Sequence, residues 1–179
     1  APHDVDPVLR EVQEVVNQCE GMVGYPLEPL IEIVKELGEF IGDNPVYEEL
    51  FNTTVDVAST REGEVTGARM LLNRGAQQLK ADQPYEAIRS LGRVLTRLSK
   101  HEGRKDVVRA LYLCSSAYER VGLPWAGRGT AVVASSIATN GFWSYGEVTP
   151  LQATCYYQVR GLEVQLGRLP QTLTWHQVY

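Results

Sequence analysis

Hydrophobic residues along the chain recur with the spacing of amphipathic helices. In residues 27–41 and 84–100, apolar side chains follow the positions i, i+3, i+4 and i+7, which places them on one face of a helix. Gly42, Gly122 and Gly167 each stand two or three residues before a proline. Because glycine commonly ends a helix and proline commonly begins one, this punctuation indicates short turns between consecutive helices.

The same marks divide the whole chain into helices. Asp6, Asn44 and Thr149 each precede a proline, and we expect them to cap the helices that follow. Residues 130–138 are rich in β-branched side chains, but their alanines recur with helical spacing and favour a helix. The predicted helices span residues 7–22, 27–41, 45–60, 63–81, 84–100, 105–121, 124–140, 149–166 and 170–179. The sequence therefore predicts an all-α fold.

Three of the predicted turns share a similar local sequence. Their prolines are Pro84, Pro124 and Pro170, so the interval between copies is about 40–46 residues. A weaker fourth copy surrounds Pro45 and aligns only with a one-residue insertion. A recurring turn between helices indicates an internal repeat of helix pairs.

The small residues near these turns resemble the pattern of a known family. Gly75 and Ala87 stand in the first clear copy, Ala131 and Ala134 in the second, and Gly167 in the third. In these features residues 64–179 resemble the tetratricopeptide repeat family. The resemblance implies a right-handed superhelical array of antiparallel helix pairs, about nine helices in all. Residues 63–179 would hold the repeats, and residues 1–62 would form an acidic helical segment with at most one degenerate repeat.

The match to the family pattern is degenerate. The interval exceeds the 34 residues of the standard repeat, which implies longer helices or longer loops. The alanine that follows the turn proline in the first copy becomes Gly127 in the second and Leu173 in the third. Related helical repeats with longer periods therefore remain an alternative.

The resemblance also implies a concave groove lined by the first helix of each pair. Arginine and tyrosine are frequent hot-spot residues, and arginine can hold a carboxylate. Carried onto this sequence, the principal groove residues are Arg69, Asn73, Lys80, Arg109, Tyr112, Ser116, Arg120 and Tyr157, with Leu72, Ala76, Glu119, Thr154, Gly161 and Gln165 beside them. Leu72 and Ala76 stand where some family members use polar residues to hold a terminal carboxylate, which argues against that binding mode.

Charge is distributed unevenly along the chain. The net charge is −5, yet residues 1–66 hold 15 acidic and three basic side chains, and residues 67–179 hold seven acidic and 14 basic ones. Arg89, Arg93, Arg97 and Lys100 would form a basic stripe on one helix face, opposite apolar positions. Such a stripe could contact the phosphates of a nucleic acid. Its expected place on the outer side of the array, the acidic chain as a whole and the acidic first third favour a solvated or internally paired face instead. The uneven charge then indicates docking, either between layers of the array or toward an oppositely charged partner.

Candidate catalytic and metal-binding residues are scarce. The three cysteines and three histidines are scattered, and the chain has no CxxC pair and none of the common phosphate-loop, zinc-helix or nucleophile-elbow motifs. Glu48 and Glu49 are adjacent, so on a helix they point to different faces. No apolar run reaches the roughly 18 residues of a membrane helix. We therefore expect no enzyme, no metal, no cofactor and no membrane segment.

The sequence thus favours a protein-interaction or scaffold module that binds a peptide or partner domain. Apolar residues near Tyr179 have no polar capping helix after them, although a solenoid needs a polar last layer. We therefore expect these residues to be a fragment of a longer cytoplasmic protein and to form its regulatory or scaffolding part. Self-association into a homo-oligomer is the first alternative, and nucleic-acid binding is the second.

Overall fold

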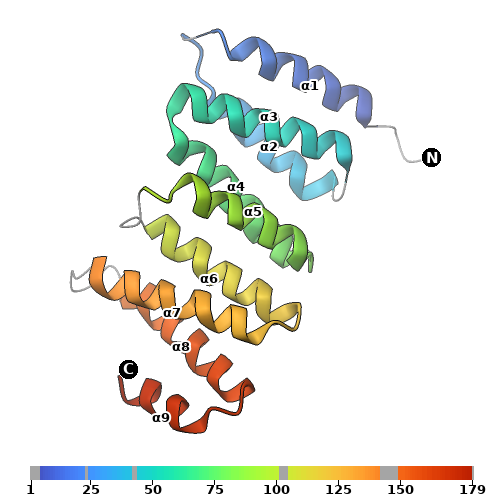
Figure 1. The fold of residues 1–179 in the computed structure, drawn as a ribbon. Helices are drawn as coiled ribbons and strands as arrows, with labels where there is room; N and C mark the ends of the chain where they lie inside the picture. Colours follow the sequence, from blue (N-terminus) through green and yellow to red (C-terminus); the bar gives the residue numbers. More distant parts are fainter. Residues whose placement is uncertain (1–4, 23, 42–43, 101–104, 142–148, 179) are drawn as a thin grey trace. The chain divides into compact units, whose positions relative to one another are not determined.

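The chain folds into helices along its described length. The computed structural model describes residues 5–22, 24–41, 44–100, 105–141 and 149–178. These residues contain all nine predicted helices and no strand (Figure 1). The helices are α1 Asp6–Cys19, α2 Glu28–Ile41, α3 Pro45–Glu62, α4 Glu64–Lys80, α5 Pro84–Arg97, α6 Lys105–Arg120, α7 Pro124–Gly141, α8 Thr149–Gln165 and α9 Leu169–Val178. The prediction of an all-α chain is confirmed.

The helix ends differ from the prediction in a few places. Asn44 caps α3 as expected, because its Oδ1 accepts the backbone N–H of Val46 at 2.8 Å and of Tyr47 at 3.0 Å. The expectation for Asp6 and Thr149 is wrong, since each is the first residue of its helix and not the residue before it. Asp6 instead accepts a hydrogen bond from Asn44 Nδ2 at 3.0 Å. The predicted stop at Gly42 lies outside the described residues.

The chain forms two compact units that divide within α4. We call Ala1–Arg74 the N-terminal unit and Gly75–Tyr179 the C-terminal unit. In the N-terminal unit, α3 packs against both α1 and α2. Its buried side chains include Leu9 from α1, Val34 from α2 and Leu50 from α3. The core of this unit therefore lies around α3.

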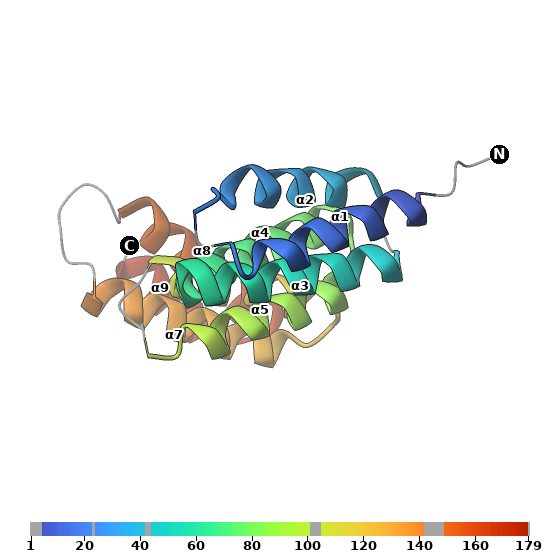
Figure 2. The same cartoon turned by 90° about the horizontal axis from the view of Figure 1, so that it is seen from above.

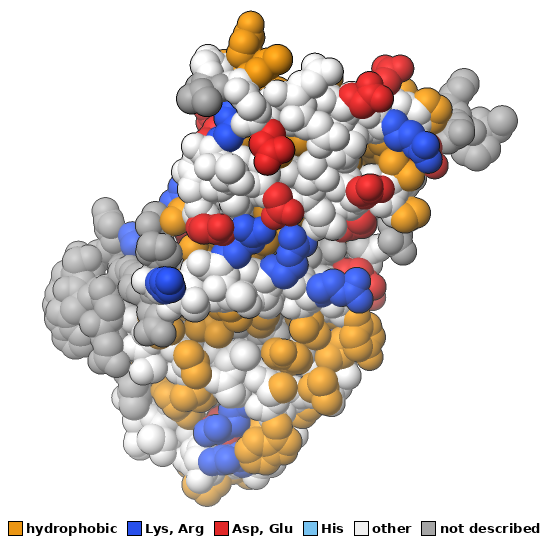
Figure 3. Space-filling view, turned by 45° about the horizontal axis from the view of Figure 1, so that its top comes forward, with side chains coloured by type: hydrophobic (Ala, Val, Ile, Leu, Met, Phe, Trp, Pro, Cys, Tyr) orange, Lys and Arg blue, Asp and Glu red, His pale blue; other side chains and the backbone are white. Residues whose placement is uncertain are grey.

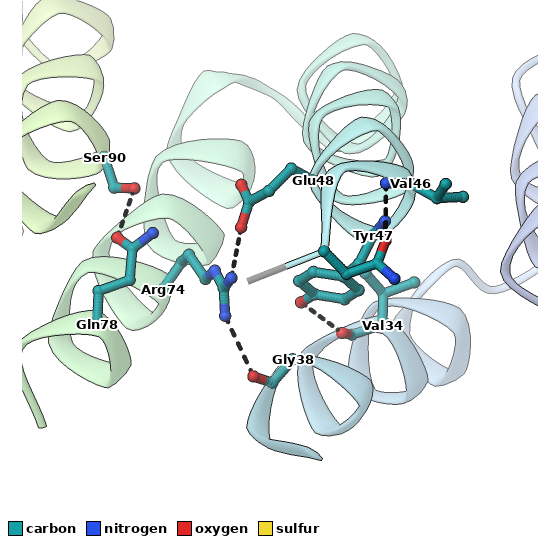
Figure 4. A network of polar contacts seen from close by, with 9 residues as sticks. Val34, Gly38, Val46, Tyr47, Glu48, Arg74, Gln78 and Ser90 are labelled. Atoms are coloured by element: carbon teal, nitrogen blue, oxygen red, sulfur yellow. Dashed lines mark hydrogen bonds and ion pairs between the residues drawn. The ribbon is translucent and has the colours of Figure 1, made fainter. Parts of the chain in front are cut away.

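Polar side chains tie the N-terminal unit together across its helices (Figure 4). The Tyr47 hydroxyl donates to the Val34 carbonyl at 2.9 Å. The buried Arg74 guanidinium donates to the Gly38 carbonyl at 3.2 Å, pairs with Glu48 and lies 4.9 Å from the centre of the Tyr47 ring. Three helices of this unit, α2, α3 and α4, are thus joined through one arginine.

In the C-terminal unit each helix from α5 to α9 packs against the next one, and α6 also contacts α8. Figure 2 shows α5 and α7 on one side of this unit and α8 on the other. Buried Ala131 of α7 packs with Val159 and Leu162 of α8, and Trp175 of α9 covers this cluster. The core of the C-terminal unit therefore continues from one helix to the next.

Three turns of the C-terminal unit have the same backbone pattern. Each contains one residue with positive φ, namely Asp82 at 58°, Gly122 at 76° and Gly167 at 69°. The N–H of the following residue bonds to the carbonyl five residues earlier: Gln83 to Gln78 at 2.8 Å, Leu123 to Tyr118 at 2.9 Å and Arg168 to Glu163 at 2.8 Å. This is the Schellman arrangement that ends helices at a left-handed residue. In every case the next helix begins at the residue directly after this donor.

Small residues allow close packing next to these turns. Ala87, Ala131 and Ala134 are buried, as expected for packing positions. A Cβ on Gly75 would lie 2.7 Å from Leu91 Cγ, and one on Gly127 would lie 3.0 Å from a backbone oxygen of α6. Both distances are too short for a methyl group without a shift of the neighbour, so these glycines permit the observed helix contacts.

Candidate interaction surface

The predicted groove residues fall into both units. Arg69 and Asn73 lie one turn apart on α4 in the N-terminal unit, and both are exposed. Lys80 is exposed at the end of α4, in the C-terminal unit. Leu72 is only 2% exposed. It belongs to the core, which corrects the expectation that it lines a groove.

Two helices of the C-terminal unit present adjoining polar faces. Glu119 of α6 accepts hydrogen bonds from Gln158 of α8, at 2.8 Å, and from Gln165 of α8. Tyr112 and Ser116 are partly exposed and lie seven and three residues before Glu119, hence on the same side of α6. Exposed Gly161 lies between the two glutamines on α8, with open space where a Cβ would stand. We call this surface the α6–α8 face, and it comprises Tyr112, Ser116, Glu119, Gln158, Gly161 and Gln165.

Arg109 and Tyr157 lie at the edges of the α6–α8 face. Arg109 is exposed three residues before Tyr112, and Tyr157 is exposed directly before Gln158. The Arg160 guanidinium lies 4.9 Å from the centre of the Tyr157 ring, and its Nη1 is 3.2 Å from His176 Nδ1. Four of the eight principal groove residues, Arg109, Tyr112, Ser116 and Tyr157, thus lie at accessible positions of α6 and α8, the two helices that Glu119 joins.

Arg120 has a structural contact that the sequence did not indicate. Its guanidinium donates to the carbonyl of Leu79 at the end of α4 and lies 3.7 Å from the Asp82 carboxylate. Arg120 stands two residues before the left-handed Gly122, as Gln165 stands two residues before Gly167. Arg120 therefore links its own turn to the previous one, and Gln165 reaches Glu119 near the end of α6.

The basic stripe lies on α5 and just beyond it. Arg89 and Lys100 are exposed, while Arg93 and Arg97 are partly buried and have interaction partners of their own. Leu91, Val94 and Leu98 on the opposite side are buried, as the pattern predicted. Lys100 follows the end of α5 at Arg97, so it is not part of the helical row. The predicted stripe of four basic side chains on one helix face is therefore interrupted, since two of them have partners and one lies beyond the helix.

The thiols of the C-terminal unit are not set up as nucleophiles. Burial raises the pKa of Cys114 to about 12 and that of Cys155 to about 11. Both thiols therefore stay protonated near neutral pH, whereas the thiolate is the reactive form. Among the residues that the structure describes, no three His, Cys, Asp or Glu side chains gather closely enough to hold a metal ion. The described helices also include none that is long and apolar enough to cross a membrane.

Sequence reasoning missed a charged cluster where α7 meets the turn between α8 and α9. Glu163 is completely buried, with Arg128 Nε 2.8 Å from its Oε1 and Arg168 Nε 2.9 Å from its Oε2. The Arg168 guanidinium lies 5.4 Å from the centre of the Trp125 ring. One signal was present: Glu163 follows Cys155 and Val159 at helical spacing, so an acid occupies an apolar stripe. A buried acid in such a stripe requires a charged partner.

Comparison with known proteins does not assign this chain. No protein-family model matches it, and no curated protein matches it at a significant level. The arguments for function therefore come from its own residues.

Proposed function

We propose that this chain is a protein-interaction module of the tetratricopeptide-like kind, in which the α6–α8 face binds a peptide or a partner domain. The observation that supports this proposal most is the pairing of α6 and α8 through Glu119, because these two helices also carry the partly exposed Tyr112 and the exposed Tyr157. In a larger cytoplasmic protein, such a module would serve as a regulatory or scaffolding part. Among the described residues, we find no cluster of reactive side chains that would support a catalytic function.

The three matching turns support the repeat interpretation. Their left-handed residues are Asp82, Gly122 and Gly167, at intervals close to those of the prolines. The contact of α6 with α8 has the form expected when the first helices of consecutive pairs stack. We propose that such stacking continues as a right-handed superhelix within the C-terminal unit.

The side chains at this surface suit a polypeptide ligand. Tyr112 and Tyr157 offer aromatic area and hydroxyl groups, and Arg109 offers a guanidinium that can pair with a carboxylate. Gly161 leaves room for a ligand backbone between Gln158 and Gln165. Binding of an extended peptide with at least one acidic residue fits this chemistry.

The test uses a peptide selected on the wild-type protein from a random displayed library. Tyr112→Ala and Tyr157→Ala are each expected to weaken its binding by about tenfold or more, since hot-spot truncations cost over 1 kcal/mol. Tyr85→Ala is the matched control, because Tyr85 is an exposed tyrosine on α5. Its binding should match that of the wild type in isothermal titration calorimetry.

Urea unfolding of the same variants separates binding from folding. Tyr112→Ala should change the unfolding free energy by less than about 1 kcal/mol, as expected for a surface side chain. A loss of several kcal/mol would mean that Tyr112 is a core residue and that the assignment is wrong. Unchanged affinity in both tyrosine variants would also reject the α6–α8 face as the binding surface.

A further inference from the structure

The charged cluster of Arg128, Glu163 and Arg168 presents cationic groups at the surface of the C-terminal unit. The buried Glu163 carboxylate engages both arginines through Nε. Within the described residues, the terminal nitrogens of the two guanidinium groups have no other ion-pair or hydrogen-bond partner, and both side chains are partly exposed. Two positive charges against one negative leave a net positive charge. The cluster is therefore held in place and still able to pair with a further carboxylate.

Exposed hydrophobic side chains surround this cluster. Trp125 is 57% exposed beside Arg168, and Leu169 and Leu173 on α9 are 61% and 63% exposed. In the lower part of Figure 3, hydrophobic side chains gather around a small group of basic ones in this unit. We call this surface the α7–α9 surface, comprising Trp125, Arg128, Arg168, Leu169 and Leu173. Exposed apolar side chains with tryptophan and arginine among them are typical of protein-binding surfaces.

A surface of complementary character exists in the N-terminal unit of the same chain. On α2, Ile33, Glu36 and Phe40 lie on one helix face and are exposed, with Phe40 at 86%. Glu32 and Glu39 flank them. The N-terminal unit holds 15 acidic and five basic side chains, and the C-terminal unit holds seven and twelve. Each copy therefore carries an acidic apolar helix face and a basic apolar surface.

We propose that α2 of one copy docks on the α7–α9 surface of a second copy. Ile33 and Phe40 would cover the apolar area at Trp125 and Leu169, and Glu36 would pair with a terminal nitrogen of Arg128 or Arg168. The two surfaces are different, so the contact is head-to-tail, and each bound copy still offers one free surface of each kind. A second copy is the chosen occupant because this chain itself supplies both the matching charge and the matching apolar side chains.

The test begins with sedimentation velocity of the wild-type protein over a concentration series. The average sedimentation coefficient should rise with concentration over roughly the micromolar range of weak interfaces. The rise should weaken when salt is increased, because the arginine–glutamate pairs are partly exposed and screened. A monomer at every concentration and salt level overturns the proposal.

Two double variants then separate the two sides of the contact. Glu36→Lys with Phe40→Ser removes the α2 side, and Leu169→Glu with Leu173→Glu removes the α7–α9 side without touching the buried Glu163 pairs. Each variant alone should be monomeric. An equimolar mixture should form a dimer that grows no further, because only one intact surface of each kind remains. Val8→Ser, at an exposed apolar position of α1, is the control and should associate like the wild type.

The equimolar mixture of the two double variants shows whether association uses the contact between α2 and the α7–α9 surface or a different contact. A mixture that stays monomeric overturns the proposal, as does undiminished association of either double variant alone. Circular dichroism of each variant checks that its helices are intact. A variant that has lost them is replaced by its single components, Phe40→Ser and Leu173→Glu, which are subject to the same two criteria.

Discussion

The two units of this protein are both helical, yet they are held together by different kinds of contact. In the N-terminal unit, long side chains reach across helices to backbone carbonyls. Examples are Arg74 to Gly38 and Arg61 to Cys19, the latter at 3.0 Å. In the C-terminal unit, the same hydrogen-bonded turn occurs three times, and side chains such as Arg120 link one turn to the previous one. The C-terminal unit thus repeats one backbone turn, whereas the N-terminal unit depends on contacts of individual side chains.

The largest expected effect comes from removing the arginine on which the N-terminal unit depends. Arg74→Ala leaves the Gly38 carbonyl and the Glu48 carboxylate without their partner. Glu48 is 37% exposed and can be hydrated, so we expect the loss of these hydrogen bonds to cost about 1–3 kcal/mol. The unfolding free energy from urea titration followed by circular dichroism measures this loss. Arg120→Ala is the counterpart in the C-terminal unit, and its more exposed contacts should cost less than about 1 kcal/mol.

The tryptophans show which unit is affected, since none of the three lies before residue 125. Tryptophan fluorescence follows the C-terminal unit, whereas circular dichroism follows the helices of both. Arg74→Ala should shift the circular dichroism transition more than the fluorescence transition. Equal shifts would contradict the view that each unit has its own set of stabilising contacts.

High pH should affect the two units in sequence. Burial raises the pKa of Cys114 and Cys155 above their ordinary value of 9.0, and it raises that of Tyr47 from 10.0 to about 12. Each group is neutral when protonated, so its stabilising effect is complete below the ordinary pKa and declines as pH rises toward the folded value. The slope is about 1.4 kcal/mol per pH unit for each group. The C-terminal unit should therefore begin to weaken near pH 9, and the N-terminal unit only above pH 10.

Urea titrations at successive pH values between about 8 and 11 check this order. The double variant Cys114→Ala with Cys155→Ala should flatten the pH dependence of the fluorescence transition. Tyr47→Phe should flatten only the part of the circular dichroism dependence above pH 10. A fluorescence transition that does not change between pH 8 and pH 10 in the wild type would refute the sequence of events.

The smallest expected effect concerns the recurring turns. Gly122→Ala and Gly167→Ala place a Cβ on a residue with positive φ, which costs about 1–2 kcal/mol. Gly92→Ala is the control, because Gly92 is helical with open space around it and alanine should stabilise the helix by up to about 1 kcal/mol. The fluorescence transition in urea measures all three. A neutral result at both turn glycines would mean that the turns are not required in this geometry.

The sequence predicted the helices because their signals are local. Periodic apolar residues, Asn44 before Pro45 and the glycines at 122 and 167 all act within a few residues of where they stand. Asp6 was misassigned as a cap because its partner is Asn44, 38 residues away. That contact depends on tertiary packing, which no local pattern contains.

The candidate site was predictable only in part. The groove positions of Arg109, Tyr112 and Ser116 came from the resemblance to the repeat family. In the structure Arg109 is exposed and the other two are partly exposed. The role of Arg120 at the Leu79 carbonyl and the pairing of Glu163 with two arginines required knowledge of which helices meet. Long-range pairs of this kind leave at most an indirect trace, such as an acid within an apolar stripe.

The three cysteines of the native chain differ in accessibility, so their labelling can report local unfolding. Cys19 is partly accessible in the N-terminal unit, whereas Cys114 and Cys155 are buried in the C-terminal unit. A thiol reagent such as a maleimide needs access and a thiolate, so it should modify Cys19 first. The other two thiols become available only when the helices around them separate. Counting labelled thiols over time by mass spectrometry would therefore follow the opening of the C-terminal unit without any substitution or attached probe.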